Sequence, residues 1–265
     1  MSSKSNDQGR FFEMACLLAL GETIAKFRKY EKVVFERNSS FEAATRAWKN
    51  TDENFQDNVL KAARAMADKL ANLKPIMVEN DDETIVLKIQ KDEEGEKGDV
   101  RDILIIRGES GWEIGLSVKH NHFAVKHSRL SLSIDFGEKW YGVPCSKTYW
   151  DSITPIFIYL KEQRNQMKNW SDLPNKDGDV YVSLLNAFME EIKRANSVDP
   201  AFPRRMVEYL LGEYVFYKVI SLDAMRTTNI QSFNLRGTLN QASRTKKPNI
   251  NTVSYTHLRA HETGR

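Results

Sequence analysis

Asp102 and Lys119 are the two residues whose types and spacing most directly suggest chemistry. A carboxylate can bind a divalent cation, which polarises a phosphate and lowers the pKa of a bound water. A nearby lysine can position that water or stabilise the charge that develops on the phosphate. Charged residues at strand ends are usually only solvated. The pair therefore indicates phosphodiester hydrolysis only if the fold brings both side chains together.

A β-hairpin is the element that must position these two residues. The apolar run at the centre of residues 100–107 predicts one strand, and residues 112–119 predict the next. Residues 108–111 between them, Gly-Glu-Ser-Gly, have the composition of a turn. Two strands joined by so short a turn favour antiparallel pairing.

The register of this hairpin decides whether the acid and the lysine meet. If Ile106 lies opposite Glu113, antiparallel pairing places Asp102 opposite Ser117, with their Cβ atoms about 5 Å apart on one face. Lys119 is two residues beyond Ser117 and shares that face. A slip of one residue would separate Asp102 from Ser117. The predicted register therefore brings a carboxylate and an ammonium together at the open end of the hairpin.

The remaining segments predict a mixed α/β or α+β domain, because helices come first, then a β-meander, then further helices and strands. Residues 92–98 are expected to form a charged turn. Ser39 and Ser40 are the predicted caps of a second helix, and Asp179 is the predicted cap of a later one. Helices are predicted at 9–29, 39–48, 51–74, 123–130, 146–167, 179–196 and 203–211, and further strands at 84–90, 214–221 and 229–236.

Composition and charge exclude several classes of protein. The chain has 265 residues, 41% hydrophobic and 28% charged, as in ordinary globular proteins. A net charge of +3 permits nucleic-acid binding without arguing for it. Cys16 and Cys145 are too few for a disulfide framework or a structural zinc site. The most apolar run, residues 14–20, is too short to span a bilayer. We expect a cytoplasmic protein with no membrane segment.

Several longer segments carry a resemblance to a known family. An acid at a strand start, followed by a hairpin and a lysine at the end of the next strand, resembles the PD-(D/E)xK nucleases. More specifically, the chain is similar to the HaeIII-type restriction endonucleases over nearly its whole length. The segments that carry this resemblance are residues 112–131, 135–140, 170–176, 206–212 and 231–239.

The resemblance implies a Mg²⁺-dependent type II endonuclease that cuts double-stranded DNA within GGCC. It implies the restriction-endonuclease-like core, a mixed sheet with an antiparallel hairpin flanked by helices. Asp102 then takes the metal-binding position and Lys119 the lysine position. Ser117 stands where the family usually has Asp or Glu, so a catalytically inactive DNA-binding protein of the same fold is the alternative. A restriction role also implies a cognate DNA methyltransferase, and a palindromic target suggests a homodimer.

The acid that replaces the one missing at Ser117 is left open by the sequence. Glu13 is favoured for catalysis and metal binding, because residues 8–13 resemble the first-helix motif of this nuclease superfamily. Glu113 is disfavoured, because four residues along a strand span about 13 Å. The remaining candidates are Asp135 and Glu138, and Asp99 is a substitute for Asp102 if the register differs.

A cluster of basic and amide side chains follows the second hairpin strand. Two alternate histidines could bind zinc, but no third ligand is evident, and the contiguous pattern does not match a histidine–asparagine–histidine nuclease. Such side chains can contact phosphates or base edges, although a solvated helix face would carry the same residues. The predicted DNA-binding residues are His120, Asn121, His122, Lys126, His127 and Arg129.

The end of the chain is expected to be foreign to the protein. Residues 254–263 resemble the translation of a transposon-end sequencing adapter. We therefore predict one endonuclease domain over residues 1–252, followed by an adapter-like tail at 253–265. In this interpretation the natural protein continues beyond residue 252, and its C-terminal part is missing here.

Overall fold

The architecture comes from a computed structural model that describes residues 3–28, 32–96, 98–121, 123, 129–234 and 239, and omits the side chains of residues 3–8 and 96. The described residues fall into two compact units. The first comes from Met1–His127 and Leu210–Pro248, and the second from Ser128–Tyr209. The predicted single domain over residues 1–252 stays a prediction, and the adapter-like tail lies outside the described residues.

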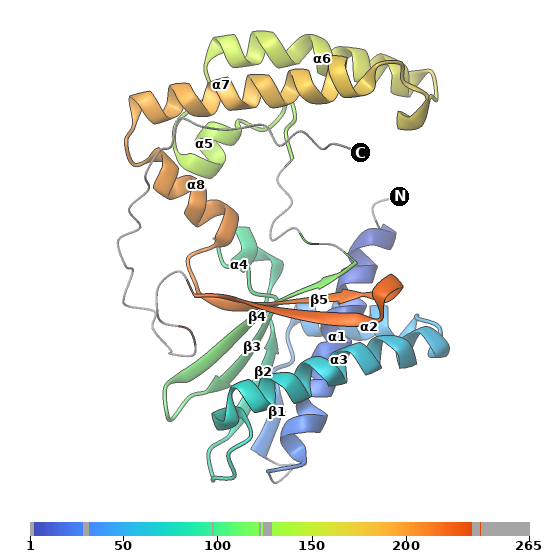
Figure 1. Ribbon diagram of the computed structural model, residues 1–265, viewed down its shortest axis with the longest axis vertical. Helices are drawn as coiled ribbons and strands as arrows, with labels where there is room; N and C mark the ends of the chain where they lie inside the picture. The colour runs from blue at the N-terminus through green and yellow to red at the C-terminus, as the bar shows by residue number, and fades with distance from the viewer. Residues whose placement is uncertain are drawn as a thin grey trace. The chain divides into compact units, whose positions relative to one another are not determined.

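A six-stranded mixed sheet forms the centre of the first unit, with its strands in the order β1 to β6 (Figure 1). β1 pairs with β2 and β4 pairs with β5 in parallel, whereas the other neighbours are antiparallel. The predicted mixed sheet with an antiparallel hairpin is confirmed. The strands are β1 Val33–Phe35, β2 Ile85–Ile89, β3 Ile103–Arg107, β4 Trp112–His120, β5 Phe216–Leu222 and β6 Thr227–Phe233.

Three helices pack beside this sheet: α1 Ser3–Ala25, α2 Ser39–Lys49 and α3 Glu53–Leu73 (Figure 1). α1 contacts α2, α3 and β4, and its fully buried Phe12, Leu17 and Leu20 join a core with Ile114 and Leu116 of β4. Burying an aliphatic or aromatic side chain of this size stabilises the fold by about 1.5–3 kcal/mol. The core therefore fixes α1 on β4, the strand that carries Lys119.

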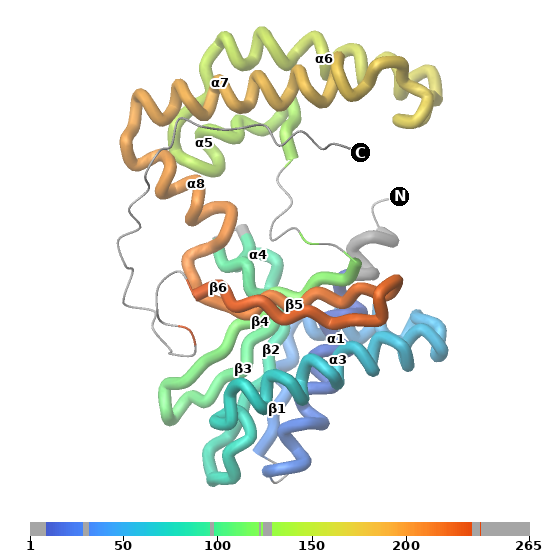
Figure 2. The backbone as a smooth tube through the Cα atoms, in the orientation of Figure 1, coloured from blue at the N-terminus to red at the C-terminus, as the bar shows by residue number. Residues whose placement is uncertain are grey.

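Two segments that are distant in the chain complete the sheet next to the hairpin. β5 lies beside β4, and β6 lies beside β5, although Ser128–Tyr209 of the second unit separates both strands from β4 in sequence (Figure 2). The short 3₁₀ helix η5, Asp223–Met225, joins β5 to β6, and η2, Pro75–Met77, follows α3. The parallel pairing of β4 with β5 brings Ser117 into register with Lys218.

The second unit is helical in its described part and has its own core. α6 and α7 contact each other, and the fully or nearly fully buried Phe136, Tyr141, Tyr149, Ile153 and Phe202 pack together. In the sequence, the boundary between the two units lies between Tyr209 and Leu210, near the C-terminal end of α8. The elements are α5 Phe136–Tyr141, α6 Lys147–Asn165, η3 Trp170–Asp172, the π-helix η4 Lys176–Val182, α7 Ser183–Val198 and α8 Phe202–Leu211.

The structure differs from the sequence-based expectation in three places. Asn38, rather than Ser39 or Ser40, caps α2, because its side-chain oxygen accepts the amides of Ser40 and Phe41. The expected charged turn after β2 contains a short helix, α4 Asp92–Glu96, whose first turn is acidic and so suits the positive end of the helix dipole.

The third difference is the π-helix at Lys176–Val182, which precedes α7 where an Asp179-capped helix start was predicted. The helix predicted at 123–130 lies largely outside the described residues. The predicted end of α8 at Gly212 is confirmed, with Gly212 at a φ of 82°. None of the helices described is both long and apolar enough to cross a membrane.

Candidate active site

The hairpin has the predicted register. Ile106 pairs with Glu113 and Ile103 pairs with Leu116. One residue earlier, the amide of Asp102 donates to the carbonyl of Leu116 at 2.7 Å. Asp102 therefore lies just beyond the paired residues at the open end of β3 and β4, where its side chain contacts Ser117.

One carboxylate oxygen of Asp102 is the centre of a hydrogen-bond cluster. Its Oδ2 accepts the backbone amide of Val118 at 2.7 Å, the hydroxyl of Ser117 at 3.2 Å and the ammonium of Lys119 at 2.9 Å. The Asp102 and Lys119 side chains are 23% and 16% exposed, so the ion pair is partly shielded from water. The structure thus brings together the acid and the lysine that the sequence singled out.

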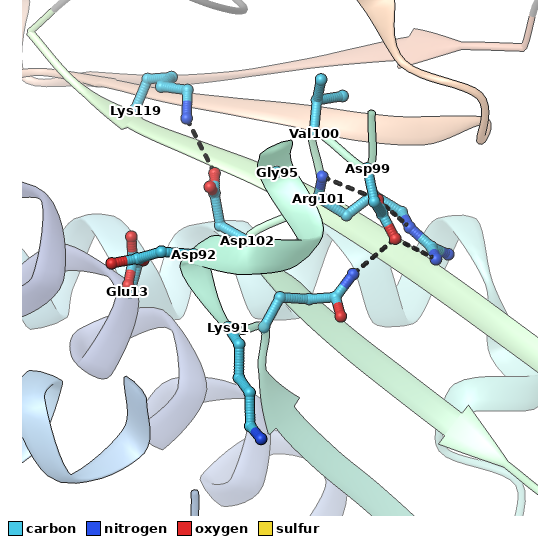
Figure 3. Close-up of a pocket in the computed structure, with 10 residues that line it drawn as sticks. Glu13, Lys91, Asp92, Gly95, Asp99, Val100, Arg101, Asp102 and Lys119 are labelled. Carbon is cyan, nitrogen blue, oxygen red and sulfur yellow. Dashed lines mark hydrogen bonds and ion pairs between the residues drawn. The ribbon is translucent and has the colours of Figure 1, made fainter. Parts of the chain in front are cut away.

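A pocket opens beside this pair, between the N-terminal half of α1 and the segment around α4 (Figure 3). The Asp102 carboxylate and the Lys119 ammonium meet on one side, and Glu13 comes from the α1 side. Its walls carry both charge signs, which suits a site for a cation and a phosphate. The lining residues are Glu13, Gln90, Lys91, Asp92, Gly95, Asp99, Val100, Arg101, Asp102 and Lys119.

Glu13 is held in this pocket by the buried face of α1, where Phe12 and Met14 pack in the core. Burial raises the pKa of Glu13 to about 8, and the negative charge of Asp102 adds to this shift. The positive charges of Lys119 and Arg10 oppose it. A carboxylate whose ionised form is opposed by burial and by a neighbouring carboxylate marks a place where a cation would be stabilised.

Three of the other candidate acids, Asp99, Glu113 and Asp135, are engaged by other groups. Asp99 accepts hydrogen bonds from Arg101 at 2.8 and 2.7 Å, and Glu113 also pairs with Arg101. Asp99 lines the pocket, but Glu113 does not. In the second unit, the Asp135 carboxylate caps α5 by accepting the amide of Glu138 at 3.0 Å. Glu13 is therefore the candidate that the described contacts leave facing Asp102.

Ser117 is fully buried between these groups. Its hydroxyl donates to Asp102, and its strand neighbour on β5 is Lys218. An acid at this position would place a third carboxylate beside Asp102 and Glu13. A serine instead leaves one fewer negative charge and retains a hydrogen-bond donor for Asp102.

The predicted DNA-binding cluster divides into described and undescribed residues. His122, Lys126 and His127 lie outside the described residues. Arg129 is exposed and belongs to the second unit. Their contact with DNA stays a prediction.

His120 and Asn121 are engaged within the first unit. The His120 side chain is 9% exposed and lies 2.9 Å from a carboxylate oxygen of Asp223. Its ring packs against Phe11, with 5.4 Å between ring centroids, and also contacts Phe12 and Phe55. Asn121, at a φ of 59°, donates to Asp223 and accepts its amide. The described contacts of both residues hold the end of β4 to the β5–β6 turn.

Sequence reasoning missed Lys218, which is 3% exposed on β5. A signal was present, because Lys218 is the one charged residue in the otherwise apolar or small-polar run Phe216–Leu222. It also missed Asp92, which lines the pocket but was assigned to a charged turn. Both residues lie near the Asp102–Lys119 pair because segments that are not adjacent in sequence pack together there.

The donor set fits a hard divalent cation. Within the residues that the structure describes, no group of three His, Cys, Asp or Glu side chains forms a complete metal cage. Mg²⁺ at phosphate-transfer sites needs no such cage, because one or two carboxylates hold it while waters and phosphate oxygens complete the coordination. Asp102 and Glu13 supply two such carboxylates at one pocket.

The mixed sheet flanked by helices is the arrangement of restriction-endonuclease-like nucleases, and comparison with known proteins is more specific. The HaeIII restriction endonuclease family matches residues 9–260, so the chain belongs to this family. The type II restriction enzyme HaeIII of Haemophilus aegyptius is 45% identical over 251 residues, which are 94% of this chain and 78% of that enzyme. No solved structure matches the chain.

Membership confirms the predicted family, the fold class and the enzyme class. The chain is a type II restriction endonuclease, a site-specific deoxyribonuclease that acts on double-stranded DNA. Enzymes of this class generally need a divalent metal. The comparisons do not name the residues that carry the reaction.

Proposed function

We propose that this endonuclease hydrolyses phosphodiester bonds within GGCC and uses Mg²⁺. The GGCC target is inferred from the 45% identity to HaeIII over most of the chain. The observation that carries the proposed site is the convergence of Asp102 and Lys119, with 2.9 Å between Oδ2 and Nζ, in the pocket that Glu13 also lines.

Asp102 and Glu13 are the residues that would hold the metal. When bound, a divalent cation polarises the phosphate and lowers the pKa of a water that attacks it. The amide of Val118 and the hydroxyl of Ser117 hold the Asp102 carboxylate in one orientation. Lys119 is placed to orient the attacking water or to stabilise negative charge on the phosphate.

The biological setting is proposed from the restriction role. We expect a cognate DNA methyltransferase that protects host GGCC sites, and a homodimer or a monomer that cuts the two strands in turn. We place the enzyme in the cytoplasm, together with the DNA on which it acts.

One observation favours the alternative of a catalytically inactive DNA-binding protein. Ser117 is not an acid, so the usual acid triplet of the PD-(D/E)xK pattern is incomplete in sequence. In our proposal Glu13 compensates for it, because it supplies the second carboxylate of the pocket.

The test is cleavage of a plasmid with several GGCC sites, and of a plasmid without GGCC, in Mg²⁺ and in EDTA. Asp102→Asn and Lys119→Met remove the two central charges. Asp57→Asn and Lys61→Met remove the same charges from exposed positions on α3 and serve as controls. We expect discrete GGCC fragments from the unmodified protein and both controls, and none in EDTA or from the two site variants.

The alternative predicts a different result. A protein without catalysis would leave the plasmid intact while binding GGCC duplexes, with an affinity that falls steeply as salt rises. Cleavage by Asp102→Asn at the unmodified rate would reject the proposed site even if the enzyme class stands.

A further inference from the structure

Lys218 lies on the active-site face of the sheet. In the parallel pairing of β4 with β5, Ser117 and Lys218 are register partners, and neighbouring strands are about 4.8 Å apart. Partners in adjacent strands point to the same face. Lys218 therefore stands beside Ser117, whose hydroxyl donates to Asp102.

The charge of Lys218 has no acidic partner among the described residues. Its ammonium donates to the carbonyl of Phe123, and no carboxylate that the structure describes forms an ion pair with it. The other buried charged side chains in the described part of the chain all have ion-pair partners. Those residues are Arg28, Glu83, Asp99, Arg101, Arg107 and Glu191.

An unpaired buried charge is costly. The penalty for an ion removed from water is several kcal/mol unless an opposite charge offsets it. Burial lowers the pKa of Lys218, and the charge of Lys119 lowers it further. Ser117, the neighbour that could have supplied a counter-charge, is neutral in this chain. An anion arriving on this face would offset the penalty.

We propose that Lys218 is a second positive charge of the phosphate site, one that disfavours a divalent cation alone and favours the DNA phosphate. This inference rests on the proposed roles of Asp102 and Glu13. Lys119 lines the pocket beside the two proposed metal ligands, and Lys218 is a second lysine on this face of the sheet. In this proposal, the two lysines weaken the attraction of the DNA-free protein for a divalent cation. The negative charge of the DNA phosphate then strengthens that attraction.

The test compares Lys218→Met with the unmodified protein in two binding measurements. The first is Mn²⁺ binding to the DNA-free protein, followed by the electron paramagnetic resonance of free Mn²⁺. The second is binding of a GGCC duplex in Ca²⁺ at a series of salt concentrations. Lys61→Met, on the exposed face of α3, is the charge-matched control, and Lys218→Arg keeps the charge.

We expect the two affinities to move in opposite directions in Lys218→Met. Removal of a nearby like charge should tighten Mn²⁺ binding about threefold or more. Loss of one phosphate-neutralising charge should weaken DNA binding and reduce the slope of log K against log salt by about 0.9. Lys218→Arg and Lys61→Met should leave the Mn²⁺ affinity unchanged. A purely structural role would not produce effects of opposite sign.

Several results would overturn the proposal. They are a fall of both the Mn²⁺ affinity and the DNA affinity in Lys218→Met, or no change in either affinity. Lys218→Gln repeats the test if Lys218→Met does not fold. Failure of both neutral variants to fold would also count against us, because an unpaired buried charge should not be needed for stability. If the unmodified protein does not cleave GGCC plasmids, the proposed function fails separately, since the binding measurements do not depend on cleavage.

Discussion

The two ends of the β3–β4 hairpin carry dense clusters of charge, yet they are built in opposite ways. At the turn end, Arg107 is 4% exposed and donates to Glu83 at 2.9 Å, to the carbonyl of Ile76 at 2.8 Å and to Asp81. The buried Arg28 also binds Asp81, at 2.6 Å. Each buried cation at this end has an acid in direct contact.

At the open end of the hairpin, by contrast, buried charged groups lack an oppositely charged partner among the residues that the structure describes. Burial and the charge of Asp102 oppose the ionisation of Glu13, and Lys218 has no acid partner within the described part of the chain. The pKa directions report the same contrast. Burial raises the pKa of Glu83, but hydrogen bonds from Ser110 and the charge of Arg107 outweigh it, so its pKa lies below the ordinary value. The pKa of Glu13 lies well above its ordinary value.

The difference teaches how to separate a structural charge cluster from a functional one. Both are partly buried and both contain short ion pairs. One is satisfied in the free protein, and in our proposal the other is completed by ligands. Perturbed carboxylates that lack compensation are the better indication of a reactive site. The following substitutions test this contrast from the largest expected effect to the smallest.

Asp102→Asn should lower the cleavage rate about a thousandfold or more, because the metal supplies several kcal/mol of transition-state stabilisation. The neutral amide keeps an oxygen that can accept the Val118 amide. We therefore expect thermal unfolding in EDTA at pH 8 to occur at an equal or higher temperature than in the unmodified protein. A large loss of stability would mean that the open end is a structural cluster too.

Arg107→Met should cost about 3–5 kcal/mol of unfolding free energy, because it leaves buried carboxylates without a partner. Urea unfolding at pH 8 measures this loss. Cleavage per folded molecule should stay close to that of the unmodified protein. Lys88→Met, which breaks a partly exposed pair with Glu36, should cost no more than about 1 kcal/mol. Equal costs for the two variants would remove the basis of the comparison.

Gly115→Ala tests the segment next to the open end. A Cβ at Gly115 would lie 2.0 Å from Cδ of Arg101, and Asp99, Glu113 and Tyr214 hold that arginine in place. Overpacking of this kind should cost about 1–3 kcal/mol in urea unfolding. Gly108→Ala is the control, because nothing lies within 4 Å of the added Cβ. An unchanged stability in Gly115→Ala would show that Arg101 is free to move.

The smallest expected effect is the pH dependence that Glu13 contributes to the metal-free protein. Its pKa is 4.5 ordinarily and about 8 in the fold. The folded state therefore binds more protons than the unfolded state between these values, and this contribution to stability is lost as pH rises from about 4.5 to 8. Glu13→Gln should remove that decline and raise the unfolding temperature at pH 8, by a few degrees for each 1 kcal/mol of the decline.

The measurement is thermal unfolding in EDTA at pH 5 and at pH 8. Glu22→Gln removes a carboxylate from the same helix that is paired with Arg64, so it should leave the decline in place. A steeper decline in Glu13→Gln than in the unmodified protein would contradict the assigned sign. Glu13→Gln should also lose cleavage activity. A loss of cleavage together with a gain in stability would show that Glu13 serves function and not stability.

Sequence was sufficient where the deciding interactions are local. The turn at residues 108–111 predicted the hairpin, and the register assumed for it, with Ile106 opposite Glu113, is the one that the structure has. That register in turn predicted the meeting of Asp102 and Lys119. A hairpin needs only its own residues to define its pairing, so this part of the site followed from one short segment.

Sequence was insufficient where strands distant in the chain pair. The register of Ser117 with Lys218 depends on how β5 returns beside β4 in parallel, and no turn between them specifies it. From the sequence alone, Lys218 was therefore only one residue of the strand predicted at 214–221. The same holds for the His120 ring, whose contacts with Phe11 and Phe55 come from two separate helices.

His120 and Phe12 have a consequence for how variation in this enzyme would be interpreted. Each is the chain neighbour of a site residue, Lys119 in one case and Glu13 in the other, and their rings lie 5.7 Å apart. This contact joins the chain neighbours of the two proposed site residues, one on β4 and one on α1. In a library of variants selected for DNA cleavage, we expect substitutions of His120 or Phe12 to be depleted together with substitutions of Lys119 and Glu13. Changes that are accepted at the two rings should occur in pairs.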